Sequence, residues 1–176
     1  MRSPLLALIL VVTPCASQAI DIGAQLAGWR YGTQLLDAYP IRTHSLPIAN
    51  FESKLDEINR EINAIPYVSD AATYREASFW QTPIQFAQSG GECRDYVVAK
   101  YSALYALGVA DSDMLFTAVR IKSGHYKGQL HAVLIVHHAG RTFILDNLHP
   151  NVRPASAMAD YEPIYFINRI SWKVAP

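Results

Sequence analysis

The sequence predicts an α+β domain in which helices come first and an antiparallel sheet follows. Three observations support this prediction: an apolar stripe at helical spacing between residues 50 and 66, a second helical pattern directly after two glycines at residues 90 and 91, and a change after Gly108 to segments rich in β-branched and aromatic residues. Consecutive helices followed by consecutive strands are typical of α+β folds. The 176 residues suffice for one domain, and a hydrophobic fraction of 51% suits a compact core.

The first 19 residues have the pattern of a secretory signal peptide. An apolar run from Leu5 to Val12 is followed by Ser17-Gln18-Ala19, which places small residues at the cleavage-site positions. The run is too short to span a bilayer. The alternatives are an ordinary N-terminal anchor or core segment, or a lipid attached to Cys15, although Cys15 follows a proline and makes a poor lipidation signal. We expect a signal peptide at residues 1–19 and a single exported domain at residues 20–176, with no membrane span in the mature chain.

The charge of the chain argues against some classes of partner. Its 15 basic and 15 acidic side chains balance, and removal of the signal peptide takes away a single basic residue. Nucleic-acid and anionic-membrane binders carry a basic surplus that this chain lacks.

Two helices are predicted before the glycine pair. Apolar residues at positions 51, 55, 58, 62 and 65 follow one another at spacings of three and four, Asn50 is suited to cap the N-terminus, and Pro66 ends the pattern. Thr82-Pro83 opens a shorter helix that ends at Ser89, because threonine caps well and proline is tolerated at the first helical position. The segment before them, residues 20–49, fits either a short helix or a packed N-terminal arm.

The third helix carries the candidate nucleophile. Gly90 and Gly91 permit a sharp turn, and the spacing from Tyr96 to Leu107 is helical and stops at Gly108. Cys93 therefore lies in the first turn, where backbone N–H groups and the helix dipole favour a thiolate. The alternative is a buried and inert cysteine. Once the signal peptide is removed, Cys93 is the one cysteine left, and a thiol kept in an oxidising compartment indicates a use.

The remainder of the chain predicts five strands. They are residues 114–122, 130–138, 141–146, 161–169 and 171–174. A two-residue loop, Ala139-Gly140, would pair His138 with Arg141 and so bring His131 and Asp146 to diagonal positions on one face of a hairpin.

These positions suggest a catalytic triad. A carboxylate at Asp146 would fix the tautomer of the His131 imidazole, and the other ring nitrogen could accept the proton of the Cys93 thiol. One cysteine and scattered histidines offer no close ligand pair for zinc. The chain also lacks a phosphate-binding glycine loop and a Gly-x-Ser-x-Gly elbow.

Several motifs together resemble one protein family. They are Phe79-Trp80-Gln81-Thr82-Pro83-Ile84-Gln85-Phe86, Gly91-Glu92-Cys93-Arg94-Asp95-Tyr96, Ala99-Lys100-Tyr101, Leu107-Gly108-Val109, His131-Ala132-Val133-Leu134 and Leu145-Asp146-Asn147-Leu148. This combination is similar to the bacterial transglutaminase-like cysteine proteinases, which include the LapG-like periplasmic proteases. The resemblance extends from about Tyr67 to Leu148.

The resemblance implies a papain-like or transglutaminase-like core and a periplasmic cysteine endopeptidase. The family's nucleophile, base and orienting acid match Cys93, His131 and Asp146. LapG-like members cut a large surface adhesin near its N-terminus, within a pair of alanines, and thereby disperse biofilm. An inner-membrane receptor that responds to cyclic di-GMP holds them in check, so the resemblance implies both partners here.

The resemblance also implies calcium, with one departure. Family members carry Asp-Cys-Glu-Asp around the nucleophile and bind calcium there, whereas this chain has Glu92-Cys93-Arg94-Asp95. Glu92 and Asp95 are the candidate ligands, and helix capping is the alternative role for both. Since calcium needs several oxygen ligands, Arg94 in place of a carboxylate predicts weaker calcium dependence.

The predicted reaction is hydrolysis of a peptide bond through an acyl-enzyme. The oxyanion would accept hydrogen bonds from the Cys93 N–H and from one side-chain donor, which is Trp80, Gln81 or Gln85. Two rival functions use the same fold: transfer of the acyl group to an amine, as in transglutaminases, and a binding module without catalysis.

Overall fold

The computed structural model describes residues 21–34, 36, 48–76 and 78–175. The expected signal peptide at residues 1–19, and residues 37–47 of the segment expected to be a short helix or an N-terminal arm, lie outside the described residues. The described elements, in chain order, are α1 (Ile22–Thr33), α2 (Ile48–Asn63), α3 (Asp70–Thr73), α4 (Pro83–Ser89), α5 (Cys93–Ala106), η2 (Asp111–Asp113), β1 (Met114–Ile121), β2 (Leu130–His138), β3 (Arg141–Leu145), β4 (Arg153–Pro154), η3 (Ala155–Asp160), β5 (Tyr161–Ile167) and β6 (Trp172–Val174).

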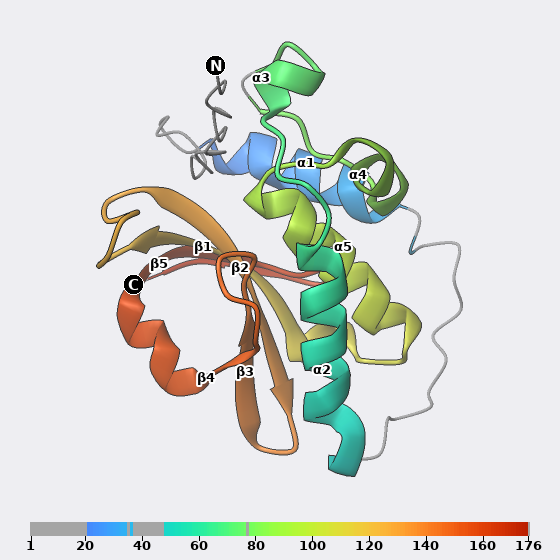
Figure 1. The fold of residues 1–176 in the computed structure, drawn as a ribbon, viewed down its shortest axis with the longest axis vertical. Coiled ribbons are helices and arrows are strands. Elements are labelled where there is room, and N and C mark those ends of the chain that lie inside the picture. Colours follow the sequence, from blue (N-terminus) through green and yellow to red (C-terminus); the bar gives the residue numbers. More distant parts are fainter. Residues whose placement is uncertain (1–20, 35, 37–47, 77, 176) are drawn as a thin grey trace, which may run out of the picture.

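The expected α+β fold is confirmed. In the described part of the chain, five α-helices precede six strands that form one antiparallel sheet in the order β4-β3-β2-β1-β5-β6. Helices α2 and α5 run side by side along one face of the sheet, and α1 and α4 lie near the N-terminal end of α5 (Figure 1). On the other face, Ala157 of η3 packs with Val133 and Ile144 of the sheet.

The β2–β3 hairpin has the predicted register. His138 pairs with Arg141, and the pairing continues without a shift to Leu134 and Leu145. Ala139 and Gly140 both have positive φ, 49° and 74°, as a two-residue type I′ turn requires. The hairpin therefore carries residues at the far end of β2 and just beyond β3 to one place.

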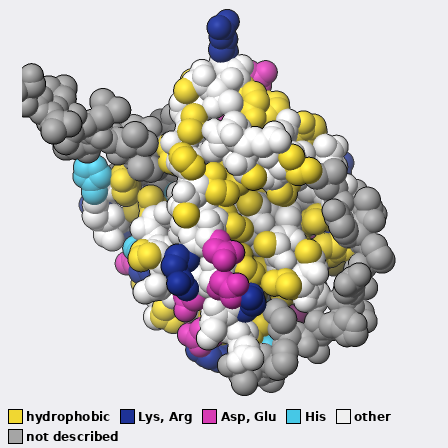
Figure 2. Space-filling model, turned by 45° about the vertical axis from the view of Figure 1, so that its right-hand side comes forward, with side chains coloured by type: hydrophobic (Ala, Val, Ile, Leu, Met, Phe, Trp, Pro, Cys, Tyr) yellow, Lys and Arg dark blue, Asp and Glu magenta, His cyan; other side chains and the backbone are white. Residues whose placement is uncertain are grey.

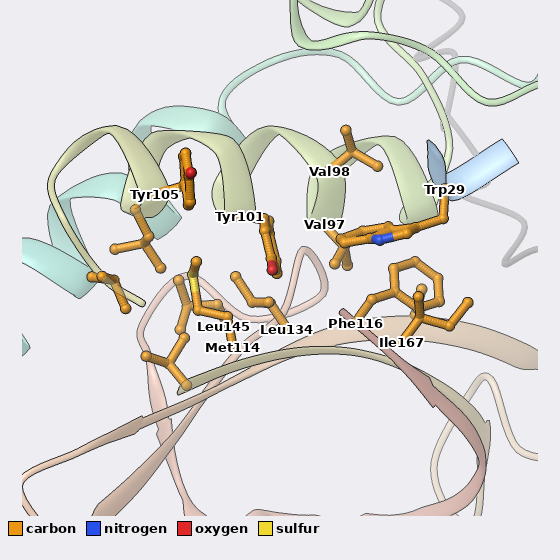
Figure 3. Close-up of a cluster of buried hydrophobic side chains, with 14 of the residues drawn as sticks. Trp29, Val97, Val98, Tyr101, Tyr105, Met114, Phe116, Leu134, Leu145 and Ile167 are labelled. Carbon is orange, nitrogen blue, oxygen red and sulfur yellow. The ribbon is translucent and has the colours of Figure 1, made fainter. Parts of the chain in front are cut away.

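The main core lies between the sheet and the helices. Trp29 of α1 and Tyr101 of α5 point toward Phe116 and neighbouring sheet residues (Figure 3). The Trp29 ring centroid lies 4.9 Å from that of Tyr101 and 5.5 Å from that of Phe116. Such aromatic pairs contribute about 0.5–1.5 kcal/mol each beyond the area they bury. They fix α5 on the sheet and so fix the position of its first residue.

Some predicted boundaries were wrong. Helix α2 begins at Ile48, so Asn50 lies inside it rather than at its cap, and it ends at Asn63. Strand β3 ends at Leu145, because the carbonyl of Asp146 accepts a hydrogen bond from Asn63 Nδ2 at 2.9 Å instead of continuing the ladder.

Other elements have weak signals in the sequence. Residues 22–33 are a helix, which settles the choice between a helix and an arm for that part of the chain. The short elements α3, β4 and η3 are too brief to show a periodicity of their own. None of the described helices is long and apolar enough to cross a bilayer.

The surface of the helical side carries both signs of charge. On the face that Figure 2 shows, acidic and basic side chains lie next to one another, and neither sign forms a continuous patch. Lys54 and Glu57 of α2 form an ion pair, with Nζ 2.6 Å from Oε2.

Candidate active site

Cys93 is the first residue of α5, as the sequence predicts. Helix α4 ends at Ser89, its C-cap Gly90 turns the chain with a φ of 71°, and Glu92 is the N-cap of α5. The Cys93 side chain is buried and belongs to the main core cluster. The N–H groups of the first helical turn lack acceptors within their own helix, so they favour negative charge at this end.

His131 and Asp146 are hydrogen-bonded. His131 Nε2 lies 2.8 Å from Asp146 Oδ1, and both side chains are almost fully buried. The second ring nitrogen, Nδ1, is also buried and has no hydrogen-bond partner among the described residues. A carboxylate that holds one nitrogen leaves the imidazole able to accept a proton at the other.

Two further donors hold the Asp146 carboxylate. The Leu148 N–H donates to Oδ1 at 2.8 Å, and the Tyr161 hydroxyl donates to Oδ2. Burial alone would raise the pKa of Asp146, but the His131 charge and these hydrogen bonds outweigh it and hold the pKa well below its usual range. Asp146 therefore stays ionised throughout the neutral range.

Cys93 and His131 belong to two neighbouring elements, α5 and β2. The helix packs directly on β2, and Cys93 shares its core cluster with Ala132, the neighbour of His131 in the strand. The described chain thus carries a cysteine at the start of α5, and on the adjoining strand an imidazole that is hydrogen-bonded to a carboxylate.

Asp95 caps the nucleophile helix. Its Oδ2 accepts from the Glu92 N–H at 2.9 Å, and its Oδ1 accepts from the Gln81 N–H at 2.9 Å. Burial raises the pKa of Asp95 to about 7, although these hydrogen bonds and the Arg94 charge oppose the rise. Both carboxylate oxygens thus point at backbone donors, which is the capping role that the sequence offers as the alternative to metal binding.

Glu92 and Arg94 belong to a second group of charges. Arg94 Nη2 forms ion pairs with Asp70, which no sequence motif indicates, and with Glu92 Oε2 at 3.3 Å. Glu92 Oε1 accepts from the Asp70 N–H at 3.0 Å. Burial raises the pKa of Glu92, while the Asp70 N–H and Arg94 lower it. Among the described residues there is no group of three or more His, Cys, Asp or Glu side chains arranged to hold a metal ion.

The three candidate oxyanion donors differ in how they are engaged. Gln81 Nε2 donates to the Gly90 carbonyl at 2.9 Å and lies 3.4 Å from Asp95 Oδ2. Gln85 Nε2 donates to the Tyr31 hydroxyl at 3.2 Å. The side-chain amides of Gln81 and Gln85 are therefore engaged in hydrogen bonds to neighbouring groups. Trp80 is a buried residue of the core cluster that contains Cys93.

Three residues near the site were missed from the sequence: Asp70, Lys100 and Tyr161. Tyr161 and Asp70 act through long-range contacts that no local pattern indicates. Lys100 lies on the nucleophile helix, two turns after Cys93 on an otherwise apolar face. It is fully buried, and burial lowers its pKa to about 7 while Asp146 opposes the change. A lysine on an apolar helix face is the signal that could have found it.

Comparison with known proteins agrees with this geometry. The sequence model of the bacterial transglutaminase-like cysteine proteinase (BTLCP) family matches residues 42–172. No curated protein matches the chain.

Solved structures of LapG from Legionella pneumophila share the fold. A calcium-bound structure matches with a TM-score of 0.62 and 24% identity over 84% of this chain and 87% of that one. A second LapG structure gives 0.60 and 25% over 90% and 82%, and an EGTA-treated one gives 0.59 and 25% over 90% and 80%. The core is thus of the transglutaminase-like type that the sequence motifs implied.

Proposed function

The chain belongs to the bacterial transglutaminase-like cysteine proteinase family and is a cysteine peptidase, and from this premise we propose that Cys93, His131 and Asp146 are its catalytic triad. The observation that carries the proposal is the His131–Asp146 hydrogen bond of 2.8 Å, which leaves the buried Nδ1 without a hydrogen-bond partner among the described residues. A general base held in this way can activate a nucleophile, and the adjoining helix begins with a cysteine.

The reaction proceeds in two halves. His131 Nδ1 takes the proton of Cys93, and Sγ attacks the carbonyl carbon of the scissile peptide bond. The C–N bond breaks, and the amine leaves with the proton that His131 returns. Water then attacks the thioester while His131 accepts its proton, and this releases a carboxylic acid and restores the thiol. Asp146 remains ionised and stabilises the imidazolium in both halves.

In this proposal, hydrogen bonds near the start of α5 stabilise the oxyanion of each tetrahedral intermediate. The Cys93 N–H is one donor in this proposal, since first-turn N–H groups point away from the helix toward its N-terminal end. Trp80 is the preferred second donor, because the amides of Gln81 and Gln85 are bound to other groups.

The mature enzyme is proposed to be periplasmic. Removal of the signal peptide at residues 1–19 takes away Cys15, the only other cysteine in the sequence. A mature chain with a single cysteine cannot form an intramolecular disulfide, and the mechanism needs Cys93 as a thiol.

The proposed substrate is the N-terminal region of a large surface adhesin, cut within a pair of alanines. Support comes from the family membership and from the resemblance to LapG-like proteases. A cyclic di-GMP-responsive inner-membrane receptor is the proposed regulator on the same ground. Incubation of the mature enzyme with an adhesin fragment, with the di-alanine intact or replaced by two bulky residues, tests the substrate. Mass spectrometry with and without an added amine separates hydrolysis from acyl transfer, because only transfer yields a product that carries the amine.

Labelling of Cys93 with iodoacetamide across pH tests the triad. We expect the wild type to label well below the ordinary cysteine pKa of about 8.5, and His131→Ala to lose that reactivity at low pH. Asp146→Ala should weaken it. His137→Ala is the matched control, since His137 lies on the same strand with an exposed side chain and bonds to Thr142.

Two results would reject the triad. One is equal labelling of wild type, His131→Ala and Asp146→Ala, which would make Cys93 an ordinary thiol. The other is an absence of labelling in all of them, which would favour the binding module without catalysis.

A further inference from the structure

We propose that Arg94 is a built-in cation at the nucleophile helix, which takes the place of a calcium ion between Asp70 and Glu92 and makes this chain independent of calcium. Arg94 is a positioning residue in this inference. The inference rests on the proposed function only in treating Cys93 as the nucleophile.

The arginine is held from three directions. Its Nη2 contacts Asp70 Oδ2 and lies 3.3 Å from Glu92 Oε2, and its Nε donates to the Phe79 carbonyl at 3.3 Å. All three charged side chains are nearly buried, with exposed fractions of 9% for Arg94, 8% for Glu92 and 1% for Asp70. Two carboxylates with one cation between them, in surroundings that exclude water, form the arrangement that a buried charge requires.

The remaining carboxylate oxygens are already bound to backbone donors. Glu92 Oε1 accepts from the Asp70 N–H, and Asp70 Oδ2 accepts from the Phe79 N–H at 2.7 Å as well as from Arg94. Both oxygens of Asp95 accept from Glu92 and Gln81 backbone groups. Only Asp70 Oδ1 lacks a hydrogen-bond partner among the described residues of this cluster.

This arrangement does not fit calcium. Calcium takes six to eight oxygen ligands, and here it would have to displace the guanidinium and several N–H groups to collect them. The guanidinium supplies the positive charge instead, as part of the chain. Its charge cannot be removed by a chelator, because arginine does not deprotonate in proteins.

The cluster also ties the nucleophile turn to the preceding segments. Glu92 and Arg94 flank Cys93, while Asp70 begins α3 and Phe79 lies just before α4. The Arg94 guanidinium between these segments therefore fixes the position of the first turn of α5.

Replacement of Arg94 with glutamate tests the inference, because it exchanges the cation for a third carboxylate. In Arg94→Glu, three carboxylates face one another without a cation, so a divalent ion becomes the means to stabilise them. We expect a melting temperature in EGTA that is lower than wild type by on the order of 10 °C. Calcium in excess of its dissociation constant should recover on the order of 5 °C. Isothermal titration calorimetry should detect calcium binding to this variant and none to the wild type.

Two other variants complete the experiment. Arg94→Met removes the cation without adding a ligand, so its melting temperature should fall in EGTA and stay low in calcium. Arg141→Glu is the matched control, because Arg141 pairs with Glu52 at 2.9 Å on the surface, where both side chains are more than half exposed. Its melting temperature should be insensitive to calcium.

Several results would contradict the inference. Calcium binding to wild type, or a wild-type melting temperature or Cys93 labelling rate that EGTA lowers and calcium restores, would overturn it. A folded Arg94→Glu that keeps the wild-type melting temperature in EGTA would also overturn it. If Arg94→Glu does not fold in EGTA, folding in calcium alone supports the inference, and failure to fold in both overturns the claim that calcium and the guanidinium are interchangeable. None of these readouts requires peptidase activity, so a failed triad would show itself separately, as labelling that does not depend on His131.

Discussion

The Asp146 carboxylate is the residue on which the candidate site depends most. It accepts from His131, Leu148 and Tyr161 in a place that is almost closed to solvent. Arg153 in turn donates from Nη1 to the Tyr161 hydroxyl at 3.2 Å. A chain of donors thus runs from a partly buried arginine through a tyrosine to the acid that orients the imidazole, and each bond polarises the next.

Tyr161→Phe should make the enzyme more sensitive to acid. The folded pKa of Asp146 lies below its ordinary value of 3.8, so its contribution to stability is complete above pH 3.8 and disappears as pH falls through the folded pKa. Loss of the Tyr161 hydroxyl raises that folded pKa and reduces the contribution. Hydrogen bonds to charged groups contribute about 1.5–3 kcal/mol, so the midpoint of acid unfolding, followed by circular dichroism, should move to higher pH.

Tyr165→Phe is the control for this experiment. Tyr165 lies on the same strand, is equally buried, and donates to Gln25 rather than to Asp146. Equal acid midpoints for the two phenylalanine variants would show that the tyrosine at position 161 does not support the carboxylate.

At the scale of the elements, the junction between α4 and α5 leaves no room for a side chain at residue 91. A Cβ at Gly91 would lie 2.6 Å from Gln81 Nε2, 2.7 Å from Asp95 Oδ2 and 2.9 Å from Phe86 Cδ2. Asp95 Oδ2 accepts the Glu92 N–H that caps α5, and Gln81 Nε2 donates to the Gly90 carbonyl. The glycine is needed here for close approach and not for an unusual backbone angle.

Gly91→Ala should therefore disturb both stability and the nucleophile. Overpacking of this kind costs about 1–3 kcal/mol, which thermal or urea unfolding would detect, and displacement of Asp95 should also change the rate of Cys93 labelling. Gly124→Ala is the comparison, because a Cβ there meets nothing within 4 Å and only its φ of 76° is unfavourable. If Gly91→Ala labels like wild type and is no less stable than Gly124→Ala, crowding at this junction is not what fixes the start of α5.

The elements that the sequence predicts correctly are those with local chemistry. Thr82 and Gln85 form the capping box of α4, and Ala139-Gly140 adopts the turn that sets the β2–β3 register. That register is what brings His131 next to Asp146, where the two side chains are hydrogen-bonded. Helix α3 was missed because four residues carry no periodicity, and its first residue is held by Arg94 from a distant part of the chain.

At the scale of the whole molecule, ionisable groups are buried inside the fold. Asp95 and Lys100 are fully buried on one helix, and burial brings both of their pKa values to about 7. The sequence indicates Asp95 as a candidate ligand and Lys100 only as part of a family motif. Neither burial nor pKa could be predicted, because both depend on how α5 is enclosed by the sheet and by its neighbouring helices. The stability of the molecule should consequently change with pH close to neutrality.

Lys100→Met should remove one part of that pH dependence. The folded pKa of Lys100 is about 7 against an ordinary 10.5, so between these values the unfolded chain binds a proton that the folded chain does not. Stability therefore rises with pH in this window, by at most about 1.4 kcal/mol per pH unit. Its Nζ has no hydrogen-bond partner among the described residues, with the Tyr96 ring 5.9 Å away and Asp146 as the charge that favours protonation.

Methionine has a similar volume and no charge, so Lys100→Met should be more stable than wild type near pH 7, and the difference should shrink as pH rises toward the ordinary lysine pKa of 10.5. Urea unfolding at a series of pH values measures this, with Lys54→Met on the surface of α2 as the control. A difference that does not change with pH would mean that the Lys100 amine is protonated in the folded chain throughout. In that case the lysine would act as a fixed positive charge toward Asp146, and its replacement should instead alter the pH profile of Cys93 labelling.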